Sequence, residues 1–202
     1  MPAPAFRFAP RRTWATLFVA AVALVVARLP QLTESLLYRR DELLAGQLWR
    51  LWTGHLVHFG WRHLLADTAV LLMSGLWLER LAPRATRLFL VFAPPAISTL
   101  LFVADPHLAF YGGLSGVAVG LVVLLALVQL RRDRLAPRWL WPAVLALVAG
   151  KVALEAFTNT PLVSDFAADI KVSSLAHLGG IACALSAWPF AHRESLDCGA
   201  PR

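Results

Sequence analysis

Four polar residues lie within or beside long apolar runs, and their types are those of nucleophilic catalysis. Ser115 stands in YGGLSGVAVG, His177 in AHLGG, and His63 and Asp67 in WRHLLAD. A serine hydroxyl becomes a strong nucleophile when a histidine takes its proton, and nearby polar donors can stabilise the oxyanion that forms. These residues therefore predict a catalytic pair, with Ser115 as nucleophile and His177 as base, provided that the fold brings them together.

The composition indicates a chain that lies in a membrane. Of its 202 residues, 58% are hydrophobic and only 15% are charged, and the mean hydropathy is +0.63. A soluble domain of this length cannot bury so much apolar surface, whereas a bilayer solvates it. The two cysteines, Cys183 in an apolar run and Cys198 in a polar tail, are predicted to be free thiols.

Six apolar runs are long enough to cross, or nearly cross, a bilayer as helices. They are residues 13–32, 63–78, 88–104, 111–130, 139–157 and 173–190. The predicted fold is an all-α polytopic membrane protein, with a six-transmembrane-helix bundle at 13–190 and cytoplasmic tails at 1–12 and 191–202. A signal peptide is the alternative for the first run, but no small-residue cleavage site follows it.

The basic residues predict how the chain is oriented. Twelve of the nineteen Lys and Arg lie before the first run, after the second, after the fourth and after the sixth. Cytoplasmic loops carry the excess of Lys and Arg, so both ends of the chain are predicted to be cytoplasmic. The segment 33–62 departs mildly from this pattern. Because topology accounts for the net charge of +7, no nucleic-acid partner is expected.

This orientation puts the four polar residues at one depth. Each lies within about five residues of the outer end of its run, which is roughly 0–8 Å deep at 1.5 Å per residue. In the second run, His63 and Asp67 share a face with Val70 and Ser74.

Small residues predict which helices touch. Gly112, Gly116 and Gly120 form a small-xxx-small series, and Gly180 follows His177 at helical spacing. A glycine-lined contact between the fourth and sixth runs would bring Ser115 and His177 together. Taken singly, each residue also has a structural interpretation, because a lone membrane serine usually bonds to its own helix and a glycine series usually serves packing. Only the combination favours catalysis.

At this point the motifs resemble a known family, the rhomboid intramembrane serine proteases. GLSG at 113–116 resembles their GxSG motif, and AHLGG resembles the segment of their catalytic histidine. His58, His63 and Asp67 fall on the three positions of their HxxxxHxxxN pattern. The resemblance covers nearly the whole chain, as a minimal six-span core. The short chain and the HLLAD segment look most like the rhombosortases, bacterial members thought to process proteins with a Gly-Gly motif, a membrane helix and a basic tail.

The resemblance implies an activity and a set of roles. Ser115 and His177 would form a catalytic dyad, since no third acid is expected beside His177, and no metal or cofactor is needed. The backbone N–H of Ser115 with His63 and position 67 would bind the oxyanion, while Gly113 and His58 would support the site. The substrates would be membrane-anchored proteins, cleaved toward the outer side of a bacterial inner membrane. The oligomeric state stays undetermined.

Position 67 departs from the family pattern, which has Asn there. An amide donates to an oxyanion, whereas an ionised Asp67 only accepts. Either Asp67 is protonated and donates through its O–H, or it orients His63 and leaves the oxyanion to other groups. The neutral donor is the preferred interpretation, because a carboxylate facing a developing oxyanion opposes the reaction.

Two other functions compete with the protease. One is an inactive rhomboid relative that binds membrane helices; the other is a metal-binding or transport protein that uses His55, His58 and His63, although no Cys or Glu completes such a site.

Three further features are given structural roles. Lys151 and Glu155 are predicted to form a structural ion pair, Pro94-Pro95 to kink or interrupt the third run, and segment 36–60 to lie in the membrane interface.

Overall fold

The computed structural model describes residues 13–132, 136–158 and 174–197, which form a helical bundle. The predicted tail 1–12, the start of the sixth run at 173, the final residues 198–202 and Cys198 lie outside the described residues. Within them, the long helices are α1 (Trp14–Arg28), α5 (Trp61–Leu81), α6 (Pro83–Ala104), α7 (Ser115–Arg132), α8 (Leu140–Thr158) and α9 (Ser174–Asp197).

The shorter elements lie mostly between α1 and α5. They are η2 (Pro30–Leu32), α2 (Thr33–Leu36), β1 (Tyr38–Arg39), α3 (Arg40–Leu44), α4 (Arg50–Thr53), η3 (Gly54–Leu56) and, before α7, β2 (Phe110–Tyr111). Segment 36–60 is therefore folded into short helices and a strand.

Four of the described helices, α6, α7, α8 and α9, are long and apolar enough to cross a membrane. A fifth span results if α1 is counted with the segment Pro30–Leu36, to which it is bent by 102°. The predicted crossing at α5 has the length, 21 residues, but also carries His63, Asp67 and Glu79. The chain is thus a multi-pass helical membrane protein with four or five such helices in its described part.

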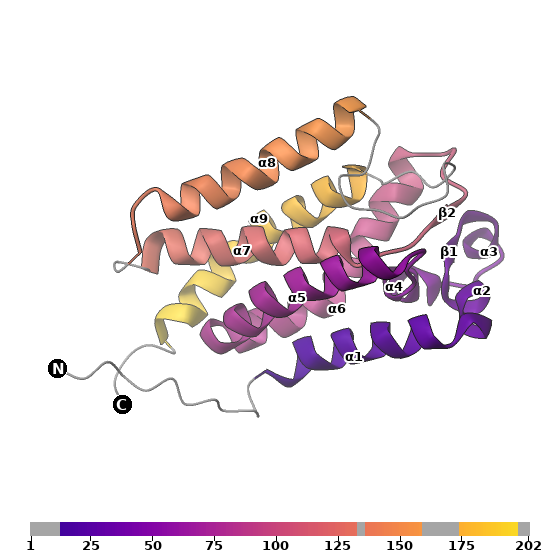
Figure 1. Cartoon of the computed structure of the whole chain (residues 1–202), viewed down its shortest axis with the longest axis horizontal. Helices are drawn as coiled ribbons and strands as arrows, with labels where there is room; N and C mark the ends of the chain where they lie inside the picture. The colour runs from indigo at the N-terminus through magenta and orange to yellow at the C-terminus, as the bar shows by residue number, and fades with distance from the viewer. Residues whose placement is uncertain (1–12, 133–135, 159–173, 198–202) are drawn as a thin grey trace.

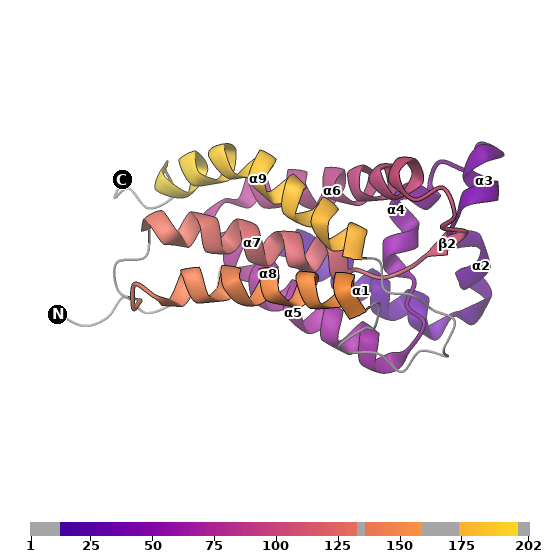
Figure 2. The same ribbon diagram turned by 90° about the horizontal axis from the view of Figure 1, so that it is seen from above.

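Successive long helices run in opposite directions along the bundle (Figure 1). α1 begins and α9 ends at one end of the bundle, while the short elements gather at the other end with the start of α7. α7 packs against α5, α6, α8 and α9, and Figure 2 shows it between α8 and α9. Along its apolar stretch, α7 is 67% buried, whereas α8 is only 17% buried. α7 is therefore the central helix of the bundle, and α8 is peripheral.

The outer faces of the bundle are apolar. Large hydrophobic side chains are strongly exposed there, among them Met73, Phe92, Val103, Leu147 and Phe157. Exposed apolar side chains at this density are expected where lipid, rather than water, surrounds a helix.

Carboxylates from distant helices accept hydrogen bonds at the N-termini of α1 and α6. Glu79 of α5 is fully buried and accepts hydrogen bonds from the backbone N–H of Ala15 (3.2 Å) and of Thr16 (3.0 Å). Glu194 of α9 does the same for Arg84 and Ala85 at 2.9 and 2.8 Å. The first N–H groups of a helix have no partner within it and carry positive partial charge, so these carboxylates join one end of the bundle together.

The third run is a continuous helix through Pro94 and Pro95. Of the two predicted alternatives, a kink or an interruption, the interruption is therefore wrong. Pro95 has no N–H to give to the carbonyl of Val91. The indole N–H of Trp52 in α4 donates to that oxygen instead, at 2.9 Å. Pro95 therefore leaves the carbonyl oxygen of Val91 free to accept from Trp52, and this hydrogen bond attaches the segment before α5 to α6.

The fourth helix begins later than predicted. Tyr111 pairs with Tyr38, and Phe110 with Arg39, in a two-stranded antiparallel sheet that joins the segment before α7 to the segment after α1. Residues 112–114 then lead into α7, whose first residue is Ser115. The serine thus lies at the head of the helix, where the backbone changes direction.

Candidate active site

A cavity of about 150 Å³ lies between α5, α7, α8 and α9 and gathers polar residues of the bundle. Its polar lining residues are His63, Asp67, Ser115, Lys151, Glu155 and His177. A larger hollow of about 730 Å³ lies among Arg39, Arg40 and Phe110, outside this region. The small cavity is the candidate site, because residues distant in sequence supply the groups of a nucleophilic reaction there.

Glycines set the spacing between α7 and α9. A Cβ on Gly116 would lie 2.8 Å from the carbonyl oxygen of Ala176, and one on Gly120 would lie 2.6 Å from that of Gly180. Gly116 follows Ser115 and Ala176 precedes His177, so this backbone contact places the two candidate residues on neighbouring helices at one level.

Gly112 is not part of that contact, in contrast to the predicted series. A Cβ there would lie 2.9 Å from the carbonyl oxygen of Val57, and the ring of Phe59 is next nearest. Gly112 therefore allows the segment before α5, and not α9, to approach the chain ahead of α7.

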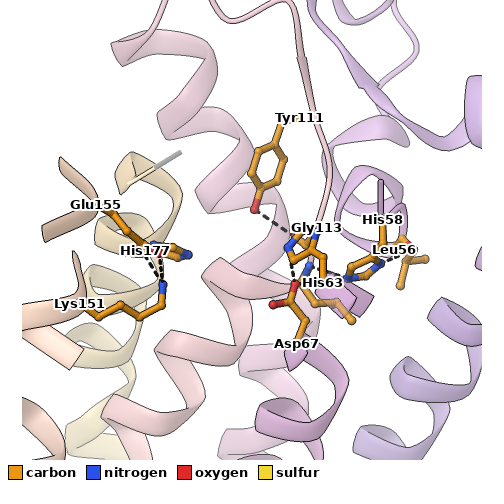
Figure 3. A network of polar contacts seen from close by, with 10 residues as sticks. Leu56, His58, His63, Asp67, Tyr111, Gly113, Lys151, Glu155 and His177 are labelled. Carbon is orange, nitrogen blue, oxygen red and sulfur yellow. Dashed lines mark hydrogen bonds and ion pairs between the residues drawn. The ribbon is translucent and has the colours of Figure 1, made fainter. Parts of the chain in front are cut away.

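The peptide unit that joins Gly113 to Leu114, one residue ahead of Ser115, is held from both sides (Figure 3). Its carbonyl, on Gly113, accepts a hydrogen bond from the hydroxyl of Tyr111 at 3.0 Å. Its N–H, on Leu114, donates to Nε2 of His58 at 3.3 Å. Burial raises the pKa of Tyr111, which keeps its hydroxyl protonated as a donor. The backbone that presents Ser115 is therefore fixed by two side chains.

Gly113 is required by its conformation and by its neighbours. Its φ is +127°, a region that residues with a Cβ rarely adopt. A Cβ there would also lie 2.6 Å from Cε1 of His63 and 3.5 Å from Oδ2 of Asp67. The absence of a side chain lets both polar residues of α5 stand beside the head of α7.

Asp67 lies between the two histidines. Its Oδ2 is 3.1 Å from Nε2 of His63 and 3.3 Å from Nε2 of His58. Nε2 of His58 already accepts from Leu114, so the other ring nitrogen, Nδ1, carries the proton and donates to the carbonyl of Leu56 at 3.2 Å. Nε2 of His58 therefore has no proton to donate, so its contact with Oδ2 of Asp67 is favourable only if Asp67 carries a proton and donates it.

His177 has an acid beside it, which corrects the expectation that none would be there. Oε2 of Glu155 lies 3.0 Å from Nδ1 of His177, and Lys151 lies 2.7 and 2.8 Å from the two oxygens of Glu155 (Figure 3). The distance is that of an ion pair, although the ring is not turned to give a good hydrogen-bond angle. Nε2 of His177 is buried and has no hydrogen-bond partner in the described part of the chain.

The third histidine of the metal hypothesis lies elsewhere. Nε2 of His55 is 2.9 Å from the carbonyl of Pro94 and 3.0 Å from Oγ of Ser98 in α6. Among the described residues, no three His, Cys, Asp or Glu side chains are placed to hold a metal ion. The arrangement of His55 is that of a residue that joins η3 to α6.

Sequence reasoning missed Tyr111 and undervalued Glu155. Tyr111 directly precedes the glycines, but no pattern in the sequence indicates that its hydroxyl will donate to the carbonyl of Gly113. Glu155 was interpreted as a structural partner of Lys151 alone, and the available signal was a buried acid in a membrane helix, which marks a functional candidate.

A multi-pass helical bundle in which serine, histidine and acid side chains from separate helices line one cavity belongs to the class of helical membrane proteins with a polar site among their helices. The Rhomboid domain family matches residues 45–193 of the chain, and the chain belongs to that family. The family generally comprises intramembrane serine proteases that act on membrane proteins. A comparison with curated proteins found no match.

Proposed function

We propose that this rhomboid protein is an intramembrane serine endopeptidase that cleaves membrane-anchored proteins near their transmembrane helix. The observation that carries the proposal is the shared cavity, which is lined by both Ser115 and His177. Nε2 of His177 is buried there without a hydrogen-bond partner among the described residues. A ring nitrogen of this kind is available to take a serine proton.

In the proposed reaction, the hydroxyl oxygen of Ser115 attacks the carbonyl carbon of the scissile peptide, and its proton passes to Nε2 of His177. The C–N bond then breaks, His177 gives the proton to the leaving amine, and an acyl ester stays on Ser115. Water then attacks the ester carbonyl carbon and loses a proton to His177. The ester bond between the carbonyl carbon and Oγ breaks, His177 returns the proton to Oγ of Ser115, and the new carboxyl end is released. The reaction requires no metal or cofactor.

The oxyanion is proposed to lie at the head of α7. The first N–H groups of a helix have no partner within the helix, and Ser115 is the first residue of α7. His63 and Asp67 stand beside Gly113 at this point, with Asp67 as a neutral donor. His58 supports the site by holding the N–H of Leu114.

We further propose that the chain crosses the membrane six times, with α1 and α5 as spans, and that both ends are cytoplasmic in a bacterial inner membrane. In support, α1 begins and α9 ends at the same end of the bundle, as an even number of crossings requires (Figure 1). Arg80, Arg84 and Arg131 belong to the helix ends found there. The site then faces the outer side.

The substrate class follows from the resemblance alone. The HLLAD segment favours a rhombosortase, which would process C-terminal tails made of Gly-Gly, a membrane helix and basic residues. The inactive alternative is not favoured, because both Ser115 and His177 are present on one cavity.

Labelling by a fluorophosphonate probe in detergent tests the proposal. The wild-type protein should be labelled at Ser115, and Ser115→Ala and His177→Ala should not be labelled. Ser186→Ala is the matched control, since Ser186 lies on α9 and bonds back to its own helix at Ala182; it should label like the wild type. Labelling that persists in a folded Ser115→Ala variant would overturn the proposal.

A further inference from the structure

Glu155 is one of three buried residues on a helix whose other residues are partly or fully exposed. α8 buries Trp141, Val152 and Glu155. The side chain of Glu155 is 3% exposed and that of His177 is 1% exposed, so their contact is shielded from the surroundings of the bundle. A buried carboxylate on a peripheral helix is unfavourable unless it is paired, so the contacts it makes indicate its purpose.

The carboxylate of Glu155 divides its contacts between a cation and an imidazole. Lys151, one turn earlier on α8, lies within 2.8 Å of both oxygens. Oε2 is also 3.0 Å from Nδ1 of His177, across the boundary between α8 and α9. Lys151 alone would account for a structural pair, but it does not account for an oxygen beside the ring of α9.

The position of the acid is the one that a general base requires. To take a proton at Nε2, the neutral ring must carry its own proton on Nδ1. An acceptor beside Nδ1 favours that tautomer, fixes the ring, and stabilises the imidazolium that forms when Nε2 is protonated. Nε2 is the buried nitrogen without a hydrogen-bond partner in the described residues, and its ring lines the cavity of Ser115.

We infer that Glu155 is a positioning residue for His177, so that the site works as a Ser115–His177–Glu155 triad in which α8 supplies the third member and Lys151 holds the acid. The inference rests on the proposed function. Glu155 touches no reacting atom and takes no proton: the proton of Ser115 moves to Nε2, and Nδ1 keeps its own. Hydrogen bonds of catalytic groups are often poorly aligned before substrate binds, which agrees with the imperfect angle.

The test measures how fast the fluorophosphonate reacts with each folded variant, with the rate at saturation and the half-saturating concentration determined separately. In the reaction, the Oγ–P bond forms as the P–F bond breaks and fluoride leaves. Glu155→Gln should lower the saturated rate by roughly 10- to 1,000-fold and leave the half-saturating concentration unchanged, since an amide replacing the triad acid lowers the rate by up to about 10⁴ elsewhere. Glu155→Asp should recover part of the rate.

Matched variants separate positioning from stability. Lys151→Met removes the cation that holds the acid but keeps the contact of Glu155 with His177, so its saturated rate should fall less than that of Glu155→Gln. If Glu155→Gln proves unstable because Lys151 loses its partner, the double variant Lys151→Met/Glu155→Gln removes both charges and should still react slowly. The thermal midpoint of each variant shows that it is folded.

The outcomes distinguish this inference from the proposed function. Wild-type rates in folded Glu155→Gln, or equal small effects of Glu155→Gln and Lys151→Met, would show that the acid is only structural, while Ser115 remains the nucleophile. Absence of labelling in the folded wild-type protein would overturn the proposed function, and the triad with it.

Discussion

A methyl group on Gly180 would overlap the carbonyl oxygen of Gly116, because the backbones of α9 and α7 touch at this point. No side chain lies between them that could move aside. Gly116 and Gly180 lie one and three positions from Ser115 and His177, so the contact that closes the bundle also determines where the two candidate catalytic residues stand.

Gly180→Ala is therefore expected to separate α7 from α9. Overpacking of this kind typically destabilises by about 1–3 kcal/mol, and labelling of Ser115 should be strongly reduced because the two helices move apart. Gly150→Ala is the matched control, since nothing lies within 4 Å of a Cβ at that position on α8. It should keep the labelling rate and the thermal midpoint, or raise the latter slightly.

Asp67 can be tested by comparing two substitutions. Asp67→Asn should retain activity, because an amide nitrogen in the place of Oδ2, the atom that contacts Nε2 of both His58 and His63, can still donate to these rings or to an oxyanion. Asp67→Ala should lose roughly 10²–10³ in rate, as expected for one oxyanion donor. If Asp67→Asn is as impaired as Asp67→Ala, a negative acceptor is required, and Asp67 orients His63 instead. Equal activity of both variants and the wild type would exclude any role.

Glu79→Gln should destabilise the bundle without altering the chemistry. Glu79 is fully buried, receives the N–H groups of Ala15 and Thr16, and lies 3.3 Å from Nε of Arg87. Loss of the charge should lower the free energy of unfolding by about 1–3 kcal/mol, measured in detergent. Glu34→Gln removes an exposed pair with Arg39 and should change it by less than about 0.5 kcal/mol.

His55 predicts a loss of stability in mild acid. Burial holds its pKa at about 4 in the folded protein, well below the ordinary value of 6.5. Between these pH values the unfolded chain binds a proton on His55 that the folded chain does not bind. The contribution of neutral His55 to the free energy of unfolding is therefore fully present above pH 6.5 and is lost as the pH falls toward 4. The loss amounts to about 3 kcal/mol at 1.36 kcal/mol per unit.

Thermal midpoints recorded from pH 7.5 to pH 4 check this prediction. In His55→Gln, an amide N–H can still reach the carbonyl of Pro94, so the variant should fold but show a flatter decline with pH. The same slope in the variant and the wild type would attribute the acid sensitivity to other groups.

The proposed orientation is tested by labelling of single cysteines in intact cells, in a background carrying Cys183→Ser and Cys198→Ser. A cysteine at Asp105, after α6, should react with an impermeant thiol reagent, and one at Arg132, at the end of α7, should not. The opposite pattern would place the cavity toward the cytoplasm.

The helices and the meeting of distant residues could be predicted from the sequence because both follow from local patterns. Apolar length and periodicity predicted the six long helices, but not all of their ends. α6 begins at Pro83, before the predicted run, and α9 continues to Asp197, beyond it. Pairing of Tyr111 with Tyr38 also delays the start of α7. The glycines at 116, 120 and 180 predicted a close contact of α7 and α9, because only the smallest residues allow backbones to touch.

The neighbours of His177 could not be predicted, because they depend on how α8 rotates about its axis. Lys151 and Glu155 satisfy one another at helical spacing, which explains both residues without any third partner. Only the packing of α8 against α9 puts Oε2 beside Nδ1. Gly112 was misassigned for a similar reason, since the start of α7 was not visible in the sequence.

The distribution of the site over four helices also has a consequence for biosynthesis. Chains emerge N-terminus first at about 5–20 residues per second. His177 follows Ser115 by 62 positions, so Ser115 exists for roughly 3–12 s before its proposed base has been made. The contact of Gly180 with Gly116 then has to form before the two face one cavity. A nascent chain therefore holds the proposed nucleophile without its proposed base while other unfolded membrane segments are nearby, so the proposed activity requires that α9 has been made and packed against α7.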